Sequence, residues 1–88
     1  MKNDAKVITN LKKSKSHLEK IINMIEADTY CIDVIQQLNA VIGYLNSAKT
    51  LKLEDHLEHC FMEGMDSKSP AKKAQLINEV LQVTKITK

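Results

Sequence analysis

The chain has 88 residues, so we expect residues 1–88 to form one small domain with a thin hydrophobic core. Apolar residues, mostly Ile, Leu and Val, make up 43% of the chain and aromatic residues only 3%, a composition that favours a folded helical protein over a disordered one. The net charge of +2 is unevenly spread, because residues 1–26 and 67–88 are rich in lysine while residues 27–66 are acidic.

The first predicted element is an amphipathic helix over about residues 4–26. Its apolar residues recur at steps of three and four, and Ser14 fills the missing place in the stripe. These residues are Val7, Ile8, Leu11, Leu18, Ile21, Ile22 and Ile25. Residues 26–29 interrupt the pattern, and Asp28 or Thr29 could cap the N-terminus of the next helix.

A second stripe predicts one long helix over about residues 29–63. It consists of Cys31, Val34, Leu38, Val41, Leu45 and Ala48, and after one place of drift Leu53, His56 and Cys60. Gly64 suits a helix C-cap, and Pro70 suits the first turn of a third helix at about residues 70–85. That helix presents Ala74, Ile77 and Leu81. The fold class is therefore predicted to be all-α.

The two cysteines, Cys31 and Cys60, are the residues with the most distinctive chemistry. The N-terminus lacks the apolar core of a signal peptide, and no stretch approaches the roughly 18 apolar residues of a membrane span. We therefore expect a cytoplasmic protein with no membrane partner, in which these thiols serve as ligands or redox groups.

His56 and Cys60 are four residues apart, a spacing that places an imidazole and a thiolate on one helix face. Imidazole and thiolates form a soft ligand set that suits Cu(I) or Zn(II). Cys31 lies 25 positions before His56, about 37 Å along one helix, so a single helix cannot bring all three to one ion. Antiparallel packing of this helix against a second copy could bring Cys31 of one subunit to His56 and Cys60 of the other.

Other function classes find less support in the sequence. An enzyme is not expected, because the chain has no oxyanion-type loop, no glycine-rich phosphate cradle and too few residues for a cleft. No helix-turn-helix, zinc-finger or RNA-binding signature is present. The lysines of the first helix could contact nucleic-acid phosphates or could simply form a solvated face. They are Lys12, Lys13, Lys15 and Lys20.

Residues 10–60, NLKKSKSHLEKIINMIEADTYCIDVIQQLNAVIGYLNSAKTLKLEDHLEHC, resemble the CsoR/RcnR family of metal-responsive repressors, most specifically in MIEADTYCIDVIQQLNAV and DHLEHC. The resemblance implies a three-helix protomer, an antiparallel four-helix-bundle dimer and a disc-like homotetramer. It also implies the Cu(I) ligands of the copper-sensing branch, which match Cys31, His56 and Cys60. Tyr30 and Glu79 match residues that surround those ligands.

The chain departs from the family pattern where DNA is bound. Asn10 and Ser47 stand at positions that are usually basic, and lysine replaces the arginines of the first helix. The leading hypothesis is a copper(I)-responsive repressor that releases operator DNA on binding metal, with Lys12, Lys13, Lys15 and Lys20 as DNA contacts. The alternatives are a copper-binding protein that has lost DNA binding and a Cys31/Cys60 thiol or persulfide sensor.

Overall fold

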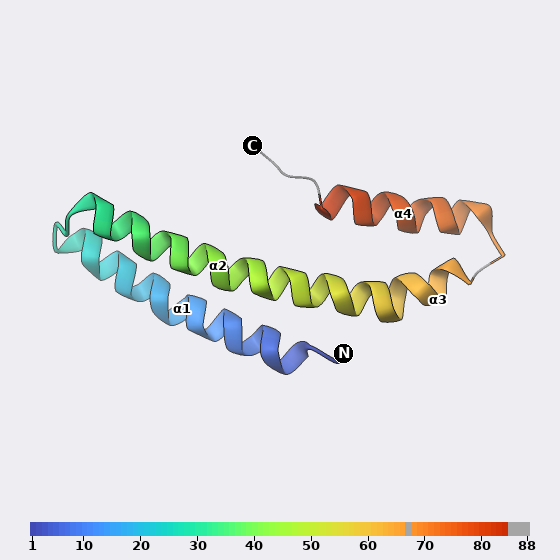
Figure 1. The fold of residues 1–88 in the computed structure, drawn as a ribbon, viewed down its shortest axis with the longest axis horizontal. Coiled ribbons are helices and arrows are strands. Elements are labelled where there is room, and N and C mark those ends of the chain that lie inside the picture. Colours follow the sequence, from blue (N-terminus) through green and yellow to red (C-terminus); the bar gives the residue numbers. More distant parts are fainter. Residues whose placement is uncertain (67, 85–88) are drawn as a thin grey trace. The chain divides into compact units, whose positions relative to one another are not determined.

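The structure, a computed structural model, describes residues 1–66 and 68–84, and within these ranges all regular structure is helical. The elements are α1 (Asp4–Glu26), α2 (Cys31–Asp55), the π-helix η1 (His56–Phe61), α3 (Met62–Met65) and α4 (Pro70–Thr84) (Figure 1). Among the described residues, no helix is long and apolar enough to cross a membrane. The chain divides into two compact units, Met1–Glu54 and Asp55–Lys88.

The first unit is an antiparallel hairpin of α1 and α2 (Figure 1). Its buried seam repeats every seven residues in both helices: Val7, Ser14 and Ile21 in α1, and Val34, Val41 and Ala48 in α2. The heptad spacing keeps one narrow stripe of each helix facing its neighbour. The Ser14 hydroxyl, although buried, donates a hydrogen bond of 2.8 Å to the carbonyl of Asn10, so its place in the apolar stripe leaves no unsatisfied donor.

The turn between α1 and α2 is a Schellman-type helix ending. The amide of Thr29 donates to the carbonyl of Met24 at 2.9 Å, and the amide of Asp28 donates to the carbonyl of Ile25 at 3.0 Å. Asp28 has a φ of 56°, in the left-handed region. Asp28 therefore ends α1. Because α2 begins at Cys31, the residue directly before it is Tyr30, and the prediction that Asp28 or Thr29 caps α2 is wrong.

Many apolar residues of the hairpin remain exposed beside the seam. Those one or four places after a seam residue lie on one side of it. Because antiparallel helices turn in opposite senses when viewed from one end, these residues of α1 and α2 share the same side of the hairpin. They are Ile8, Leu11, Leu18, Ile22, Ile25, Ile35, Leu38, Ile42 and Leu45, each between 39% and 57% exposed, and we call them the apolar side.

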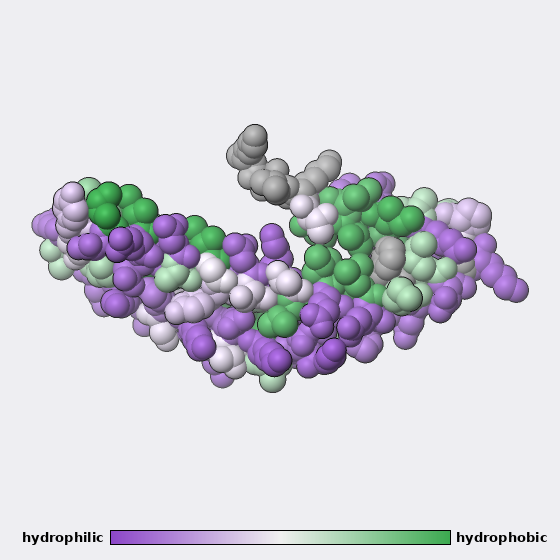
Figure 2. All heavy atoms as spheres, viewed as in Figure 1, coloured by the Kyte–Doolittle hydropathy of each residue, from purple (hydrophilic) through white to green (hydrophobic). Residues whose placement is uncertain are grey.

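The opposite side of the hairpin, the polar side, carries residues three places after or one place before the seam. Across it, His17 Nε2 of α1 and Gln37 Oε1 of α2 are 2.6 Å apart, and the rings of His17 and Tyr44 lie 5.9 Å apart. In Figure 2 hydrophobic side chains gather along the edge of the first turns of α2, while the visible surface of α1 is mostly hydrophilic.

The second unit contains η1, α3 and α4. The long helix predicted for residues 29–63 is therefore a helical run that changes from α to π at His56. Gly64 lies inside α3 with a negative φ, so its predicted role as a C-cap is wrong. Leu76 is the buried residue of α4, whereas Ile77 and Leu81 of the predicted stripe are 44% and 57% exposed.

The start of α4 follows the sequence prediction. Pro70 is its first residue, where its missing amide and fixed φ are tolerated. The hydroxyl of Ser69 accepts a hydrogen bond of 3.3 Å from the amide of Lys72, so Ser69 caps the helix. The predicted last residue, Lys85, is outside the described residues.

Candidate metal centre and lysine grooves

His56 and Cys60, two of the predicted metal ligands, both lie in η1. The amide of Met62 donates to the carbonyl of Leu57, which is the i→i+5 hydrogen bond of a π-helix. This pattern gives more residues per turn than an α-helix, so residues four apart still stand close to one full turn apart. His56 is half-buried and Cys60 is exposed. The segment therefore presents an imidazole and an accessible thiol from successive turns.

Cys31, the third predicted ligand, is the first residue of α2 and is exposed. Both cysteines are free thiols. Helix α2 has 25 residues, which corresponds to about 37 Å at 1.5 Å per residue. Within one chain, over the part that the structure describes, no three His, Cys, Asp or Glu side chains gather as a metal site.

The other residues that the resemblance associates with the ligands have these positions. Tyr30 directly precedes α2 and is 68% exposed. Glu79 of α4 is exposed, and its Oε1 accepts a hydrogen bond of 3.2 Å from Gln75. His59, also in η1, is exposed.

Two buried polar residues were not predicted from the sequence. Asp55, immediately before His56, is fully buried. Asn3 is only 5% exposed, and its side-chain amide donates a hydrogen bond of 3.2 Å to the carbonyl of Leu51. In the sequence, Asp55 comes seven positions after Ala48, which is the same spacing as between Val34, Val41 and Ala48.

Ion pairs add to this tie between the N-terminal residues and the last turns of α2. Lys52 Nζ lies 3.0 Å from Asp4 Oδ1, and Lys2 Nζ lies 3.7 Å from Glu54 Oε1. The N-terminal ammonium and Lys52 hydrogen-bond the Asp4 carboxylate and lower its pKa below its ordinary value. These groups are largely solvated, so each pair contributes little by itself.

The predicted DNA-contacting lysines are all exposed, but they do not share one surface. Lys12, Lys13 and Lys20 line a groove on the polar side of the hairpin, together with Thr9, Ser16, His17 and Tyr44. We call this groove of about 660 Å³ the lysine groove. Lys15 comes one place after the seam residue Ser14, so it lies on the apolar side with Ile8 and Ile22.

A second groove on the polar side is nearly neutral. Its lining includes Asn10 and Ser47, the two positions at which the family resemblance led us to expect basic residues. The other lining residues are Ala5, Lys6, Thr9, Asn46, Thr50 and Leu51, and we call this the neutral groove. Asn10 and Ser47 therefore line the same groove. The neutral groove lies next to the lysine groove, and Thr9 lines both.

Comparison with known proteins agrees with the family resemblance. Residues 3–85 match the family described as metal-sensitive transcriptional repressor. The chain is 40% identical over 74 residues to the copper-sensing transcriptional repressor CsoR of Mycobacterium ulcerans, covering 83% of this chain and 63% of that protein. It is 37% identical over 79 residues to CsoR of Bacillus subtilis, covering 89% of this chain and 75% of that protein.

The copper-sensing transcriptional repressor RicR of Mycobacterium tuberculosis is 30% identical over 78 residues, covering 89% of this chain and 81% of that protein. The chain spans less than two thirds of the length of the mycobacterial CsoR proteins that it matches. The family match nevertheless covers the whole of helices α1 to α4. The chain therefore belongs to the metal-sensitive transcriptional repressor family.

Proposed function

We propose that this protein is a copper(I)-responsive transcriptional repressor that releases operator DNA when it binds metal. The observation that carries the proposal is that α2 has the exposed thiol of Cys31 at its first residue and continues directly into η1, which holds His56 and Cys60. The copper-sensing relatives support this choice of ligand.

The three donors fit Cu(I) by their chemistry. Two thiolates and one imidazole are soft ligands that favour Cu(I) over hard cations. Both cysteines are free and accessible, as ligands must be before metal arrives. Tyr30 and Glu79 are proposed to support the ligands through hydrogen bonds, which orient a coordinating imidazole. In the reducing cytoplasm, where such a regulator would work, both thiols stay available.

A second copy of the chain is proposed to complete the site. Nine half-exposed Ile and Leu residues make up the apolar side of the hairpin. Burying the exposed half of them would contribute on the order of 10 kcal/mol, which is comparable with the cost of association. An antiparallel homodimer around these helices would place Cys31 of one subunit next to His56 and Cys60 of the partner subunit. Two such dimers would form the tetramer.

In this proposal copper binding and DNA binding are linked. Cu(I) joins residues of two subunits, so it favours the arrangement of subunits in which those residues meet. It can release DNA only if DNA prefers a different arrangement. The rival is a copper-binding protein without DNA control, and the observation in its favour is the neutral groove formed around Asn10 and Ser47.

The test measures copper and DNA binding together. Fluorescence anisotropy of a labelled duplex from the region upstream of the protein's own gene is recorded for reduced apo-protein and for protein loaded with Cu(I). We expect one Cu(I) per protomer and a DNA affinity that copper lowers by about 5- to 150-fold. Equal affinity in both states would contradict the repressor and favour the rival.

Matched variants test the ligands. His56→Ala should abolish both tight copper binding and the copper effect on DNA, whereas His59→Ala, an exposed histidine in the same π-helix, should change neither. Mixing Cys31→Ala with Cys60→Ala protein should restore one intact site per heterodimer. If subunits are shown to exchange and the mixture still binds no copper, the shared site is wrong.

A further inference from the structure

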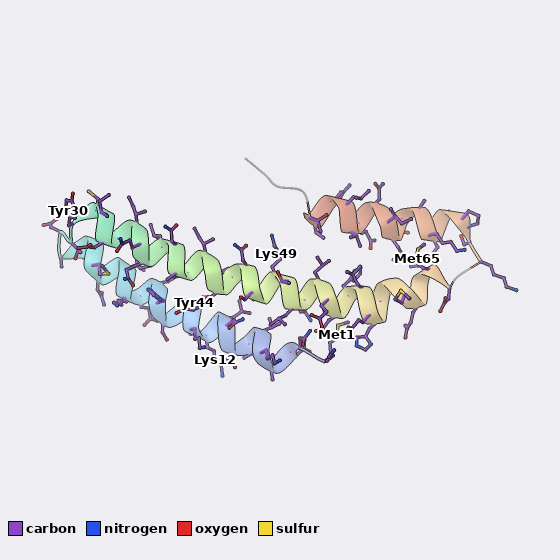
Figure 3. All side chains as sticks on the ribbon, in the orientation of Figure 1. Met1, Lys12, Tyr30, Tyr44, Lys49 and Met65 are labelled. Carbon is purple, nitrogen blue, oxygen red and sulfur yellow. The ribbon has the colours of Figure 1, made fainter. Side chains whose placement is uncertain are left out.

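The residues that lead into α1 are tied to the last turns of α2 by one buried hydrogen bond and two ion pairs. We call this set of contacts the N-terminal clamp. It joins Asn3 to the carbonyl of Leu51 at 3.2 Å, Asp4 to Lys52 at 3.0 Å and Lys2 to Glu54 at 3.7 Å. In Figure 3 Met1 lies at the end of the hairpin where α1 begins, which is the end that the clamp holds together.

Asn3 supplies the strongest contact of the clamp. It is 5% exposed, so the hydrogen bond from its side-chain amide to Leu51 is shielded from water and electrostatically stronger than the same bond in solvent. The ion pairs join side chains that are about half exposed, and such pairs contribute little. Replacing Asn3 therefore removes the main connection without changing any charge.

On the α1 side, the clamp is continuous with the first turn of the helix. Asn3 is the N-cap of α1, and its carbonyl accepts a hydrogen bond of 3.0 Å from the amide of Val7. Val7 is buried in the seam between α1 and α2. Because packed side chains leave few voids, a shift of Asn3 also moves Val7 and the packing of α1 on α2.

On the α2 side, the clamp meets the segment that leads to His56, one of the proposed metal ligands. Leu51 lies five positions before His56, which is about 7.5 Å along a helix. The hydrogen-bond register changes from α to π at His56, directly after the fully buried Asp55. Backbone hydrogen bonds connect successive helical turns, so a ligand that fixes His56 also restricts the last turn of α2.

The two ends of the hairpin are closed in different ways. At one end the turn at residues 27–30 joins α1 to α2 covalently, with hydrogen bonds from the amides of Asp28 and Thr29. At the other end, where α2 leads into η1, the N-terminal clamp joins them by noncovalent contacts. The clamp is therefore the point at which α1 can respond to a change in the last turn of α2.

We propose, on the basis of the proposed function, that the N-terminal clamp carries the effect of copper from His56 to α1, with Asn3 as the positioning residue. Cu(I) bound at His56 shifts the carbonyl of Leu51, and Asn3 passes that shift to the first turn of α1. The clamp thus couples copper binding to DNA binding and belongs to neither site. Coupling of this kind sets how strongly each ligand affects the other.

The experiment separates coupling from binding. The DNA affinity of reduced apo-protein and of Cu(I)-loaded protein is measured by anisotropy for wild type, Asn3→Ala and the control Asn23→Ala, each checked for folding by circular dichroism. Asn23 is exposed and comes two positions after the seam residue Ile21, so its side chain points away from α2. We expect Asn3→Ala to reduce the factor by which copper lowers DNA affinity by about 2- to 30-fold, and Asn23→Ala to leave this factor unchanged.

Two further measurements distinguish coupling from a loss of structure. Asn3→Ser keeps a favourable N-cap residue for α1, but its shorter side chain does not reach Leu51, so it should show the same loss of the copper effect. Apo-protein DNA affinity and one Cu(I) per protomer should be kept in both variants. Because coupling is reciprocal, competition with a Cu(I) chelator, with and without saturating duplex, should give the same factor.

A full copper effect in both Asn3 variants would overturn the inference. A loss of apo-protein DNA affinity as large as the loss of the copper effect would also overturn it, because a merely structural contact gives that result. A wild type whose DNA affinity does not change with copper would refute the proposed function together with the clamp. A wild type that responds to copper, with Asn3 variants that respond equally, would refute the role of the clamp alone.

Discussion

Replacing Gly64 with alanine should destabilise the protein, whereas replacing Gly43 with alanine should stabilise it. A Cβ added at Gly64 would clash with Cδ1 of Leu76 and would lie only 3.3 Å from its Cγ. Leu76 is buried, so it has little room to move. A Cβ added at Gly43 would meet nothing within 4 Å.

The two substitutions share one favourable effect and differ in the packing around the new methyl group. Both glycines lie within helices, so alanine gains about 0.8–1.0 kcal/mol of helix propensity at each. Overpacking at Gly64 costs about 1–3 kcal/mol, which leaves a net loss of about 0–2 kcal/mol. The difference between the two variants, about 1–3 kcal/mol, is then the cost of overpacking against Leu76 alone.

The assay is urea unfolding followed by far-ultraviolet circular dichroism, at one fixed protein concentration because association affects apparent stability. A double-mutant cycle isolates the interaction between the two positions. Leu76→Ala alone should cost about 2–5 kcal/mol, and Gly64→Ala in that background should be stabilising, since the obstructing side chain is gone. If Gly64→Ala were as stabilising as Gly43→Ala in the wild-type background, the close packing of α3 on α4 would be refuted.

Three further predictions concern the hairpin. Asp28→Gly should stabilise the hairpin by up to about 1 kcal/mol, because glycine adopts the positive φ without strain. Asp28→Ala should not stabilise the hairpin, and the urea midpoints of the two variants measure the difference. Ile21→Ala should cost about 2–5 kcal/mol in the same assay, because Ile21 packs with Val34 in the buried cluster. Because the pKa of Asp4 is lowered in the folded protein, its charged form adds stability at pH values above 3.8, the ordinary pKa. This stability is lost as the pH falls through the lower pKa of the folded protein. Asp4→Asn should therefore lower the urea midpoint slightly at neutral pH, less so in high salt, and not in strongly acidic solution.

Local signals in the sequence were enough to predict where α1 lies and where α4 begins, and they also led to the proposed metal ligands. Steps of three and four residues predicted α1 at its observed bounds, and Pro70 marked the start of α4, because both signals depend on local backbone geometry. The spacing of His56 and Cys60 likewise follows from one helical segment. Cys31 was grouped with His56 and Cys60 because a thiolate is a soft ligand like theirs, although Cys31 lies too far along the helix to meet them within one chain.

The choice of apolar residues that form the seam depends on how the two helices pack. Val34, Leu38 and Val41 belong to one stripe in the sequence, yet Val34 and Val41 are buried against α1 while Leu38 is 39% exposed. The contact between two helices is narrower than the apolar face of either, so hydropathy cannot identify the inner part of that face.

Packing and hydrogen-bond register also decided the features that the sequence left hidden. The change from α to π at His56 alters which amide pairs with which carbonyl, and that register leaves no mark on the hydrophobic pattern. Gly64 lies within a helix and not at a turn, and the absence of a side chain there leaves room for Leu76. Lys13 and Lys15 are both exposed lysines of α1. They lie on opposite sides of the hairpin because Ser14, the residue between them, faces α2.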